Sequence, residues 1–591
     1  MGTIQQAAIP RTTVETFLAR AGSLGERPFL HYHLDGDWRC LTWAEACQRV
    51  QRVAAALVAE GVRPGDRVAL ISPNRYEWIL ADFGIQAAAA VTVPVFPSLL
   101  PATVRAMVED SGAVLGIADS EDLACKLLGP RTMRRVVTFE PDLHRWFQRE
   151  PLAAEVEELE RRQARLEGDD LASIVYTSGT TGESKGALLA HRNVVEMAAS
   201  DLRAFRLGPD DVLLSVLPYA HVLERLSAVF NVVTAGAQVW VSRGLDHLVE
   251  DIAEVRPTLM IGVPRLFEKV HDRVVEQAAA QPRLRRALFG WALGAGRRYV
   301  LAARPGVASR LQQALADRLV LTGVRRRLTG GRLRFFVSGG APLSEEVETF
   351  FWALGVRVLQ GWGMTELTSA ATSNTEEEHR FGTVGRPLPG VELRIDAEGE
   401  ILARGPGVML GYHHRARLTA AALEDGWLRT GDVGVLEDGY LRITDRKKDL
   451  IKTAGGKYVA PLPLESRLQE AREIDWALLV GDERPFVSAL IVPDWGALRT
   501  GCGIQGDPDV LVSDPRVRAI VQARVDALNQ ELAGFESVRA FALLARPFSE
   551  ANGELTPTLK PKRRIIVRRY REVIDTMYEA ARLAHVSGAG G

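Results

Sequence analysis

The sequence lacks several features that would place it in a special class. Only four of its 591 residues are cysteine and none forms a CxxC pair, so neither a zinc site nor a disulfide framework is expected. So few cysteines are typical of a protein in a reducing compartment. Acidic and basic residues nearly cancel, giving a net charge of −1, which argues against nucleic acid as the main partner. The composition, 47% hydrophobic and 25% charged, is that of a soluble globular chain of about three to five compact units.

No stretch of the chain has the pattern of a membrane span or an export signal. The longest uncharged stretch, residues 83–104, contains Pro94, Pro97 and Pro101, and a spanning helix would need about 20 apolar residues without such breaks. We interpret it as buried strand and turns. Residues 1–20 lack the basic, apolar and small-residue order of a signal peptide. The sequence therefore predicts a cytoplasmic protein, with peripheral membrane contact as an open alternative.

Lysine is scarce as well, and its placement is informative. The chain has nine lysines against 64 arginines. An ammonium is a compact point charge whereas a guanidinium is a planar fork, so the positions that keep lysine are those expected to need an ammonium. Seven of the nine lie in three short segments rich in glycine or turns, namely Lys185, then Lys447, Lys448, Lys452 and Lys457, then Lys560 and Lys562.

The apolar pattern predicts an α/β fold. Residues 50–60 have the spacing of an amphipathic helix, and a turn then leads into the strand Val68–Ile71, an alternation typical of βαβ units and a largely parallel sheet. Strand patterns recur at 212–217, 259–263, 333–338 and 356–360. We expect a large N-terminal domain, residues 1–445, with mixed or parallel sheets flanked by helices and a β-rich subdomain at about 390–445, followed by a small α+β C-terminal domain, residues 446–591.

Residues 281–334 are rich in arginine and have a helical pattern, with three arginines in succession at 325–327. One interpretation is a solvated helical excursion. The other is a patch for anionic lipid or for a phosphorylated ligand.

The strongest chemical signal is the segment 174–186, in which a strand leads into small hydroxyl and glycine residues. Glycines let backbone N–H groups converge on an anion, hydroxyls add donors and a lysine adds charge. The spacing is not that of a Walker A loop, which requires GxxxxGK[ST]. The segment predicts a polyphosphate cradle made by Thr177, Ser178, Gly179, Thr180, Thr181, Gly182 and Lys185.

Further segments place small, aromatic or charged residues after strands. Gly339, Gly340 and Ala341 leave a flat backbone surface for a ring or chain, and Trp362 lies between two glycines, so that its face could contact a base. Thr365 and Glu366 could bind phosphate and Mg²⁺. Taken singly, these segments are equally well explained by tight turns or a buried tryptophan. Asp432 could accept ribose hydroxyls, although an Asx turn is the simpler interpretation of that residue alone.

In this order, the segments resemble the AMP-forming acyl-activating (adenylate-forming) superfamily, which includes acyl-CoA synthetases, luciferases and peptide-synthetase adenylation domains. The resemblance covers residues 40–570, and the segments 217–225 and 262–270 are similar to the long-chain fatty acyl-CoA synthetase branch. It implies a ligase that uses ATP and Mg²⁺ to convert a fatty acid to acyl-AMP with release of pyrophosphate. Thioester formation with CoA, releasing AMP, would follow.

The resemblance also implies roles for individual residues. Lys560 would bridge the carboxylate and the α-phosphate, Lys185 would hold the β- and γ-phosphates, and Thr365 and Glu366 would lie beside the α-phosphate and Mg²⁺. His221 would lie near the junction of the carboxylate and thiol tunnels, the alternative being a core histidine. The nucleotide would contact the phosphate loop and Gly339, Gly340, Ala341, Gln360, Gly361, Trp362, Gly363, Asp432 and Arg446.

The C-terminal domain would be mobile, which the resemblance attributes to a hinge at Lys448. Its rotation would withdraw Lys560 and present Lys452 and Gly455 to CoA. Three positions depart from the family pattern: Ser184 replaces a usual proline, Trp362 a commoner tyrosine, and Pro561 an aliphatic residue. Chain length of the acid stays open, as does the choice between monomer and homodimer. Delivery of the acyl group to a carrier protein instead of CoA is the alternative function.

Overall fold

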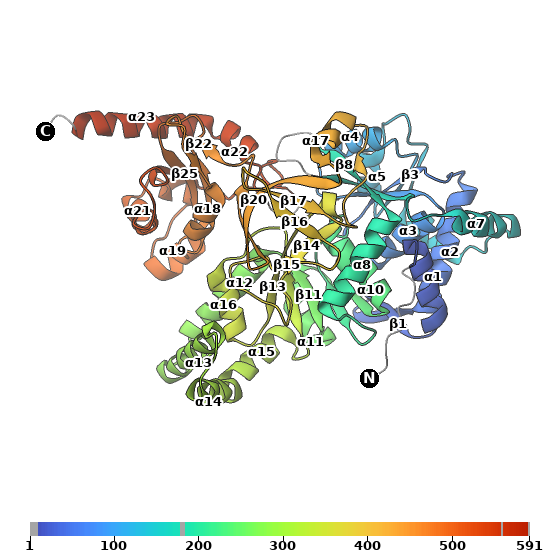
Figure 1. The fold of residues 1–591 in the computed structure, drawn as a ribbon, viewed down its shortest axis with the longest axis horizontal. Coiled ribbons are helices and arrows are strands. Elements are labelled where there is room, and N and C mark those ends of the chain that lie inside the picture. The colour runs from blue at the N-terminus through green and yellow to red at the C-terminus, as the bar shows by residue number, and fades with distance from the viewer. Residues whose placement is uncertain (1–9, 178–183, 557–559, 589–591) are drawn as a thin grey trace.

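The computed structural model describes residues 10–177, 184–556 and 560–588. Within them the chain is an α/β protein, with two large sheets and a third, smaller sheet in the N-terminal three-quarters and a separate α+β layer at the C-terminal end (Figure 1). The α/β class expected from the apolar pattern is confirmed.

The first large sheet has seven strands in the order β18-β8-β7-β4-β3-β5-β6. Its central pairs are parallel, whereas β8 runs antiparallel to β7, with Thr177 opposite Lys185. This pairing places the two ends of the expected phosphate loop side by side. The strands are β3 (Arg67–Ile71), β4 (Val91–Val95), β5 (Leu115–Ala118), β6 (Arg135–Thr138), β7 (Leu171–Thr177), β8 (Lys185–Ala190) and β18 (Gly411–Tyr412).

The second large sheet has nine strands in the order β15-β14-β13-β12-β11-β9-β10-β1-β2. Its parallel strands β11, β12 and β13 end at the glycine-rich segments singled out in the sequence. The strands are β1 (Pro28–Leu34), β2 (Asp37–Thr42), β9 (Val212–Ser215), β10 (Gln238–Val241), β11 (Leu259–Gly262), β12 (Phe335–Ser338), β13 (Val358–Met364), β14 (Ser369–Ser373) and β15 (Arg386–Pro387).

A third sheet of five antiparallel strands follows in the chain, in the order β16-β17-β20-β19 with β21 also paired to β20. The pairing of β20 with β21 sets Asp432 opposite Arg446. The strands are β16 (Glu392–Ile395), β17 (Glu400–Arg404), β19 (Leu423–Glu424), β20 (Trp427–Glu437) and β21 (Tyr440–Arg446).

The C-terminal part has a core of its own, built on the sheet β24-β25-β26 and the hairpin β22-β23. Figure 1 shows it as a distinct lobe beside the third sheet. Its strands are β22 (Ile451–Lys452), β23 (Tyr458–Val459), β24 (Ile474–Val480), β25 (Val487–Pro493) and β26 (Val538–Leu543).

Helices cover the sheets and fill the connections between strands. In the first part of the chain they are α1 (Thr13–Leu24), α2 (Trp43–Ala59), α3 (Tyr76–Ala87), α4 (Pro101–Ser111), α5 (Glu121–Leu127), α6 (His144–Gln148), α7 (Ala153–Arg165), α8 (His191–Phe205), α9 (Val222–Glu224), α10 (Asn231–Ala235), α11 (Leu248–Val255) and α12 (Pro264–Ala279). Later helices are α13 (Arg283–Leu301), α14 (Val307–Ala316), α15 (Thr322–Thr329), α16 (Glu345–Ala353), α17 (Ala416–Ala422), α18 (Pro461–Gln469), α19 (Trp495–Cys502), α20 (Pro508–Leu511), α21 (Pro515–Asn529), α22 (Arg563–Arg569) and α23 (Arg571–Gly588). Short helical turns are η1 (Phe139–Leu143), η2 (Arg225–Phe230), η3 (Leu245–His247), η4 (Asp317–Leu321) and η5 (Thr365–Leu367).

The interpretation of residues 83–104 as strand and turns was partly wrong. Residues 83–87 complete helix α3, residues 101–104 begin helix α4, and only 91–95 form the expected buried strand, β4. Every residue of α3 from Glu77 to Ala87 is buried, so the helix has no polar face and no periodic pattern by which its sequence could be recognised. Among the described residues, no helix is both long and apolar enough to cross a membrane.

Candidate active site

The glycine-rich ends of both large sheets, the third sheet and the C-terminal lobe meet around one cavity of about 730 Å³. Segments that are far apart in the sequence therefore contribute to a single site. The predicted residues that line it are Thr177, Lys185, His221, Gly339, Gly340, Ala341, Gln360, Gly361, Trp362, Gly363, Thr365, Glu366, Asp432, Arg446, Lys448 and Lys560.

Two groups of predicted residues are not in this lining. Lys452 and Gly455 lie in and beside the hairpin β22-β23, where the Lys452 ammonium is 5.6 Å from the ring centroid of Tyr458. The structure does not bring these two residues to the cavity. The cradle positions Ser178, Gly179, Thr180, Thr181 and Gly182 lie outside the described residues.

In one part of the cavity wall, Tyr412 joins Lys185 and Glu366. The Tyr412 hydroxyl donates a 2.8 Å hydrogen bond to Glu366 Oε1, and the Lys185 ammonium lies 5.1 Å from the centroid of the tyrosine ring. Burial, together with the neighbouring charge of Lys448, lowers the pKa of Lys185. Sequence reasoning missed Tyr412, because strand β18 reaches the site only by pairing with β8.

Elsewhere in the cavity wall, the Asp432 carboxylate is held by two donors. Trp362 Nε1 donates to Asp432 Oδ2 over 2.7 Å, and Arg446 Nε lies 3.0 Å from Asp432 Oδ1. Both partners come from the cavity wall, and Trp362 is itself buried. The carboxylate is thus preorganised as an acceptor in the wall of the cavity that residues 339–341 also line.

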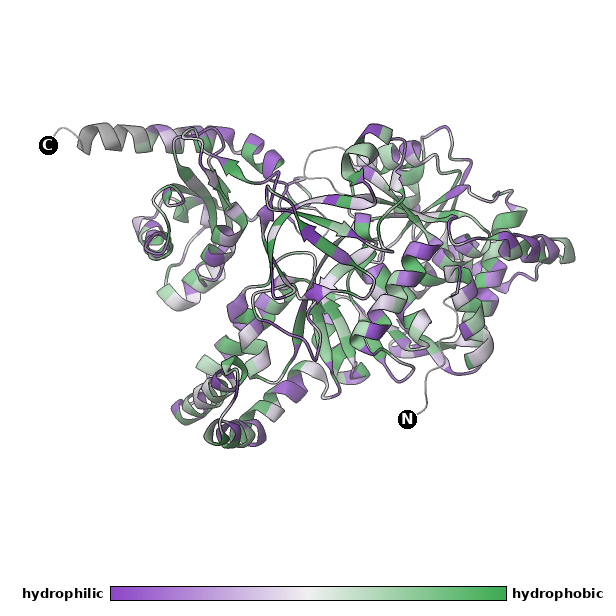
Figure 2. Ribbon diagram, viewed as in Figure 1, coloured by the Kyte–Doolittle hydropathy of each residue, from purple (hydrophilic) through white to green (hydrophobic). Residues whose placement is uncertain are grey.

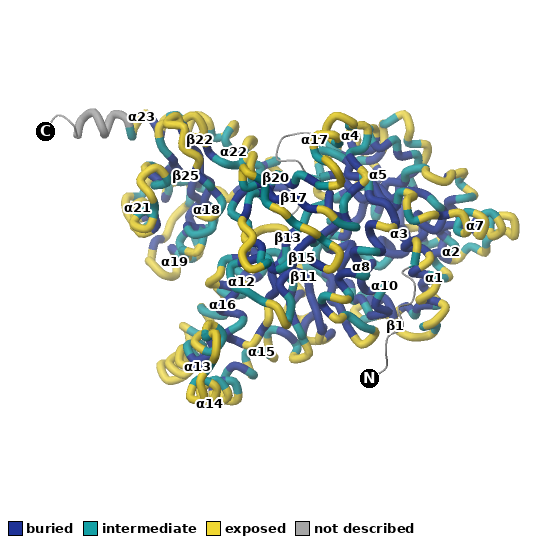
Figure 3. The backbone as a smooth tube through the Cα atoms, viewed as in Figure 1, coloured by how far each residue is buried: buried dark blue, intermediate teal, exposed yellow. Residues whose placement is uncertain are grey.

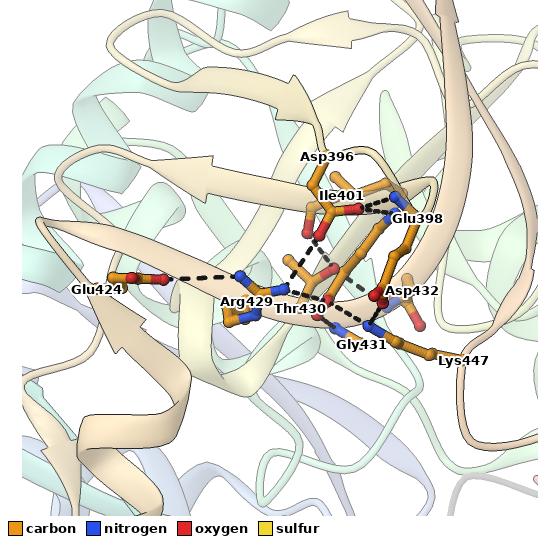
Figure 4. Close-up of polar contacts among 10 residues, drawn as sticks. Asp396, Glu398, Ile401, Glu424, Arg429, Thr430, Gly431, Asp432 and Lys447 are labelled. Carbon is orange, nitrogen blue, oxygen red and sulfur yellow. Dashed lines mark hydrogen bonds and ion pairs between the residues drawn. The ribbon is translucent and has the colours of Figure 1, made fainter.

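The turn before Asp432 is fixed by a buried carboxylate, Glu400. This side chain accepts from the Gly431 N–H over 3.0 Å and lies 3.1 Å from both Arg429 Nη2 and Lys447 Nζ. Figure 4 shows Arg429 and Lys447 reaching into this cluster from two sides, with Lys447 also bonded to Glu398 and Arg429 to Asp396. The network ties β20 to the segment that leads into the C-terminal lobe.

Lys560 reaches the cavity from the C-terminal lobe. Its backbone N–H donates to Thr556 Oγ1 over 3.0 Å, and three residues later Arg563 forms a buried ion pair with Glu465 at 2.7 Å. Burial and the charge of Arg446 lower the pKa of Lys560 to about 8, against the opposing influence of Asp432 and Glu366. The lobe therefore holds a cation among the charged residues of the N-terminal part.

His221 belongs to the cavity wall rather than to the core. It lines the cavity beside Phe96, whose ring centroid is 6.4 Å away, and its Nδ1 accepts from the Leu223 N–H over 3.2 Å. Burial and the nearby charge of Lys560 lower the pKa of His221 to about 3, so its imidazole is neutral at physiological pH. The helical segment that follows is anchored by Arg225, which pairs with the fully buried Asp82 at 2.6 Å.

Contacts between α12 and the C-terminal lobe hold Lys560 in this position. Arg265 forms an ion pair with Asp475, and its guanidinium lies 5.3 Å from the ring centroid of Trp476. A second ion pair joins Arg472 to Glu276 at 3.0 Å. Neither pair was expected from the sequence, since both depend on the docking of two separately folded parts.

The donor set at Glu366 suits a magnesium ion that is held mainly by a nucleotide. Glu366 is buried, and only its Oε1 is engaged by Tyr412. No cluster of three or more His, Cys, Asp or Glu side chains suited to a metal occurs in the described part of the chain. Mg²⁺ in phosphate-binding sites is commonly held by one or two carboxylates together with substrate phosphates, so the residues present fit that mode.

Comparison with known families assigns both parts of the chain. Residues 17–413 match the model described as AMP-binding enzyme, and residues 448–582 match the AMP-binding enzyme C-terminal domain.

Curated relatives are similar over almost the full length. The chain is 36% identical over 580 residues to the long-chain-fatty-acid–CoA ligase FadD15 of Mycobacterium bovis, an alignment that covers 92% of this chain and 93% of the relative. It is 31% identical over 586 residues to the peroxisomal long chain acyl-CoA synthetase 7 of Arabidopsis thaliana, an alignment that covers 92% of this chain and 82% of the relative.

Solved structures share the fold at lower identity. The o-succinylbenzoate CoA synthetase MenE of Bacillus subtilis, in complex with its acyl-adenylate intermediate, superposes with a TM-score of 0.70 at 22% identity, covering 93% of this chain and 97% of that one. The adenylation domain of a carboxylate reductase from Mycobacterium chelonae gives a TM-score of 0.73 at 22% identity, covering 96% of this chain and 91% of that one.

Proposed function

The chain belongs to the AMP-binding enzyme family, in its long-chain acyl-CoA synthetase branch, and we propose that it is an AMP-forming long-chain fatty acid–CoA ligase. In the first half-reaction, a carboxylate oxygen of the fatty acid attacks the α-phosphorus of ATP and pyrophosphate leaves. In the second, the thiol of CoA attacks the acyl carbon of acyl-AMP, forming the thioester and releasing AMP.

The observation that carries this proposal is the position of Lys560. Its ammonium enters the cavity from the C-terminal lobe, where the charges of Arg446, Asp432 and Glu366 act on its pKa. Its own charge in turn contributes to the lowered pKa of His221. Transfer at a phosphoryl centre depends mainly on positioning and on stabilising charge. A buried cation between the adenosine side and the phosphate side of the cavity is suited to that task.

For the first half-reaction, we assign the nucleotide to the wall around Trp362. The base contacts Trp362 and the backbone at 339–341, and the ribose hydroxyls donate to Asp432, which Arg446 orients. Lys185 contacts the terminal phosphates. Lys560 lies between the carboxylate and the α-phosphate, where negative charge develops.

The fatty acid would enter along the apolar side of the cavity. Phe96, Val222 and Leu223 line this side next to His221. Because its imidazole is neutral, His221 does not compete with Lys560 for the carboxylate, and it marks where the acyl carbon meets the thiol. The length of this path, and so the preferred acid, is for experiment to determine.

For the second half-reaction, we propose that residues 446–591 rotate as one domain relative to residues 1–445, about a hinge at Lys448. Lys452 and Gly455, which are away from the cavity in the present arrangement, would then approach it with CoA, and Lys560 would leave it. Gly455 lets the pantetheine arm pass close to the backbone. The contacts of Arg265 and Arg472 described above must break for this rotation.

Mg²⁺, when bound with ATP, would supply neutralisation of phosphate charge, and Glu366 is the side chain placed to hold it. The Tyr412 hydroxyl orients that carboxylate by its 2.8 Å hydrogen bond. We further propose that the enzyme contacts membranes peripherally, through the helices of residues 281–334. Sedimentation velocity of the purified protein distinguishes a monomer from a homodimer.

Product analysis tests the proposal. Purified protein is incubated with Mg-ATP and fatty acids of increasing length, with and without CoA, and pyrophosphate, AMP and acyl-CoA are quantified. Joint appearance of AMP and acyl-CoA with a long-chain acid is the expected result. Pyrophosphate with acyl-AMP that accumulates despite added CoA would instead indicate a carrier protein as acceptor.

A further inference from the structure

Residues 281–334 form the most charge-segregated part of the chain. They hold thirteen arginines, no lysine and no glutamate, and their only acidic residue is Asp317, so this segment carries a formal charge of +12 in a chain whose total is −1. The remainder of the chain is correspondingly acidic. This segment forms α13, α14, η4 and α15, which protrude at one edge of the molecule (Figure 1).

Most of these arginines have no carboxylate partner within the described residues. Arg325 pairs with Asp317 at 2.8 Å, and Arg334 pairs with Asp211 and Glu376. Arg325 and Arg334 are also the only two arginines of this segment that are not exposed. The eleven exposed arginines are Arg283, Arg285, Arg286, Arg297, Arg298, Arg304, Arg310, Arg318, Arg326, Arg327 and Arg332.

The same helices expose aliphatic side chains in a regular row. On α14 and η4, Val307, Leu311, Leu315 and Leu319 follow one another at intervals of four residues and are 75%, 68%, 50% and 59% exposed. Residues this far apart share one helix face. The face toward the protein is instead made by Ala316 and Val320. Figure 3 shows these helices as largely exposed, and Figure 2 shows hydrophobic and hydrophilic residues side by side on them.

Helix α13 adds a second apolar row. Leu284, Leu288 and Trp291 are exposed at helical spacing along its first half, whereas its second half packs on α16 through Ala292, Ala295 and Gly296. At Gly296 the packing is so close that a Cβ would lie 2.2 Å from the Ala353 carbonyl oxygen. The body of the protein therefore anchors α13 at one end and leaves the other end projecting.

We propose that α13, α14 and η4 form a docking surface for an anionic lipid bilayer. A helix that lies in a membrane interface has an apolar face and is flanked by lysine or arginine. Here the leucine row would insert among the acyl chains while the arginine heads contact lipid phosphates at the same level, since arginine can bury its stem and keep its charge in the headgroup region. Positive charge without acidic partners matches a negatively charged surface.

Two other interpretations of this segment fit the structure less well. A merely solvated pair of helices would carry mixed charges and few outward leucines. A single phosphorylated ligand would need arginines that converge, but these are spread along α13, whose 19 residues span roughly 28 Å, and along the two following elements. A planar, extended anionic surface matches that distribution.

Vesicle co-sedimentation of the full chain, without ATP or substrate, tests the proposal. Vesicles are made of phosphatidylcholine alone or with about a third phosphatidylglycerol, at about 0.1 M and about 0.5 M salt. We expect binding to the anionic vesicles that weakens at high salt. Absence of binding, or equal binding to both vesicle types at both salt concentrations, would overturn the proposal.

Paired variants locate the surface. Leu311→Ser with Leu315→Ser should weaken binding by at least roughly tenfold, because each leucine loses the free energy of apolar burial. The matched control is Leu152→Ser with Val156→Ser at the start of α7, which are 64% and 40% exposed on an acidic helix at the opposite end of the view in Figure 1. The control should bind like the unaltered chain. Equal losses in both double variants would refute the assignment of the surface.

Charge variants measure the electrostatic contribution to vesicle binding. Arg310→Gln with Arg318→Gln should weaken binding by roughly fivefold per arginine at low salt, whereas Arg499→Gln with Arg539→Gln, exposed arginines of the C-terminal lobe, should not. Equal thermal unfolding midpoints show that each variant is folded. If sedimentation velocity shows that the leucine variant breaks a dimer while vesicle binding is unchanged, the face is a self-association surface and the proposal is wrong.

A bilayer bound at this surface would supply the fatty acid directly to the enzyme, a consequence that rests on the proposed function. The leucine variant should then keep its kcat with acids presented in solution but show a raised KM for acids dissolved in anionic vesicles. A chain with no ligase activity on any acid would contradict the proposed function, while the vesicle-binding result would still decide the docking surface.

Discussion

Replacing Lys560 by alanine should affect the two half-reactions very differently. The ammonium of Lys560 interacts with Asp432, Glu366 and Arg446 at the centre of the cavity, where charge develops during adenylation. Loss of one preorganised group of this kind typically costs about 10²–10³ in rate, or about 3–4 kcal/mol. Arg446 and Lys185 also line the cavity and remain, so the loss should stay within that range.

The assay measures each half-reaction separately. Acyl-AMP formation is followed by pyrophosphate release without CoA, and thioester formation is followed by supplying synthetic acyl-AMP with CoA. In the Lys560→Ala variant the first rate should fall by about 10²–10³, whereas the second should stay within about threefold of the unaltered enzyme. A comparable fall in both rates would refute the assignment of Lys560 to the first step.

Three further predictions concern charge and movement. Since the pKa of Lys560 is lowered to about 8, its ammonium is present below that pH and lost above it, and kcat/KM for adenylation should fall above about pH 8. Lys560→Arg should remove this fall at high pH, because a guanidinium stays charged there. A pH profile that Lys560→Arg leaves unchanged would contradict the assignment. Arg265→Ala removes an ion pair and a cation–π contact worth about 1–2 kcal/mol together. It should slow adenylation by up to roughly 30-fold without slowing thioester formation from acyl-AMP. Lys448→Pro should preserve adenylation, because the Lys448 amide donates no hydrogen bond to any backbone carbonyl in the described part of the chain. The variant should slow the thioester step, because proline stiffens the hinge. A variant in which only adenylation falls would refute the hinge.

The α/β fold class and the central site residues could be inferred from short segments of sequence. Trp362, Glu366 and Asp432 follow or lie within strands whose patterns are visible, and the structure brings them to one cavity. Helix α3 was misinterpreted in part because it is buried on all sides. Its sequence has no period to distinguish it from a buried strand.

Features that depend on docking could not be read from the sequence. Tyr412 enters the site through a two-residue strand paired to β8, and Arg265 meets Asp475 only because the C-terminal lobe packs against α12. Likewise, the arginine-rich segment was visible as a charge run, but its outward row of leucines was not. Whether a leucine in a helix faces the core or the solvent depends on which neighbour packs against it.

The central claim is that this protein makes acyl-AMP first and the CoA thioester second, and one measurement tests it most directly. Purified protein with Mg-ATP, a long-chain acid and CoA should release pyrophosphate, AMP and acyl-CoA in equal amounts. Without CoA, it should form acyl-AMP and pyrophosphate and then stop. Release of ADP, or an adenylate that accumulates unchanged after CoA is added, would contradict it.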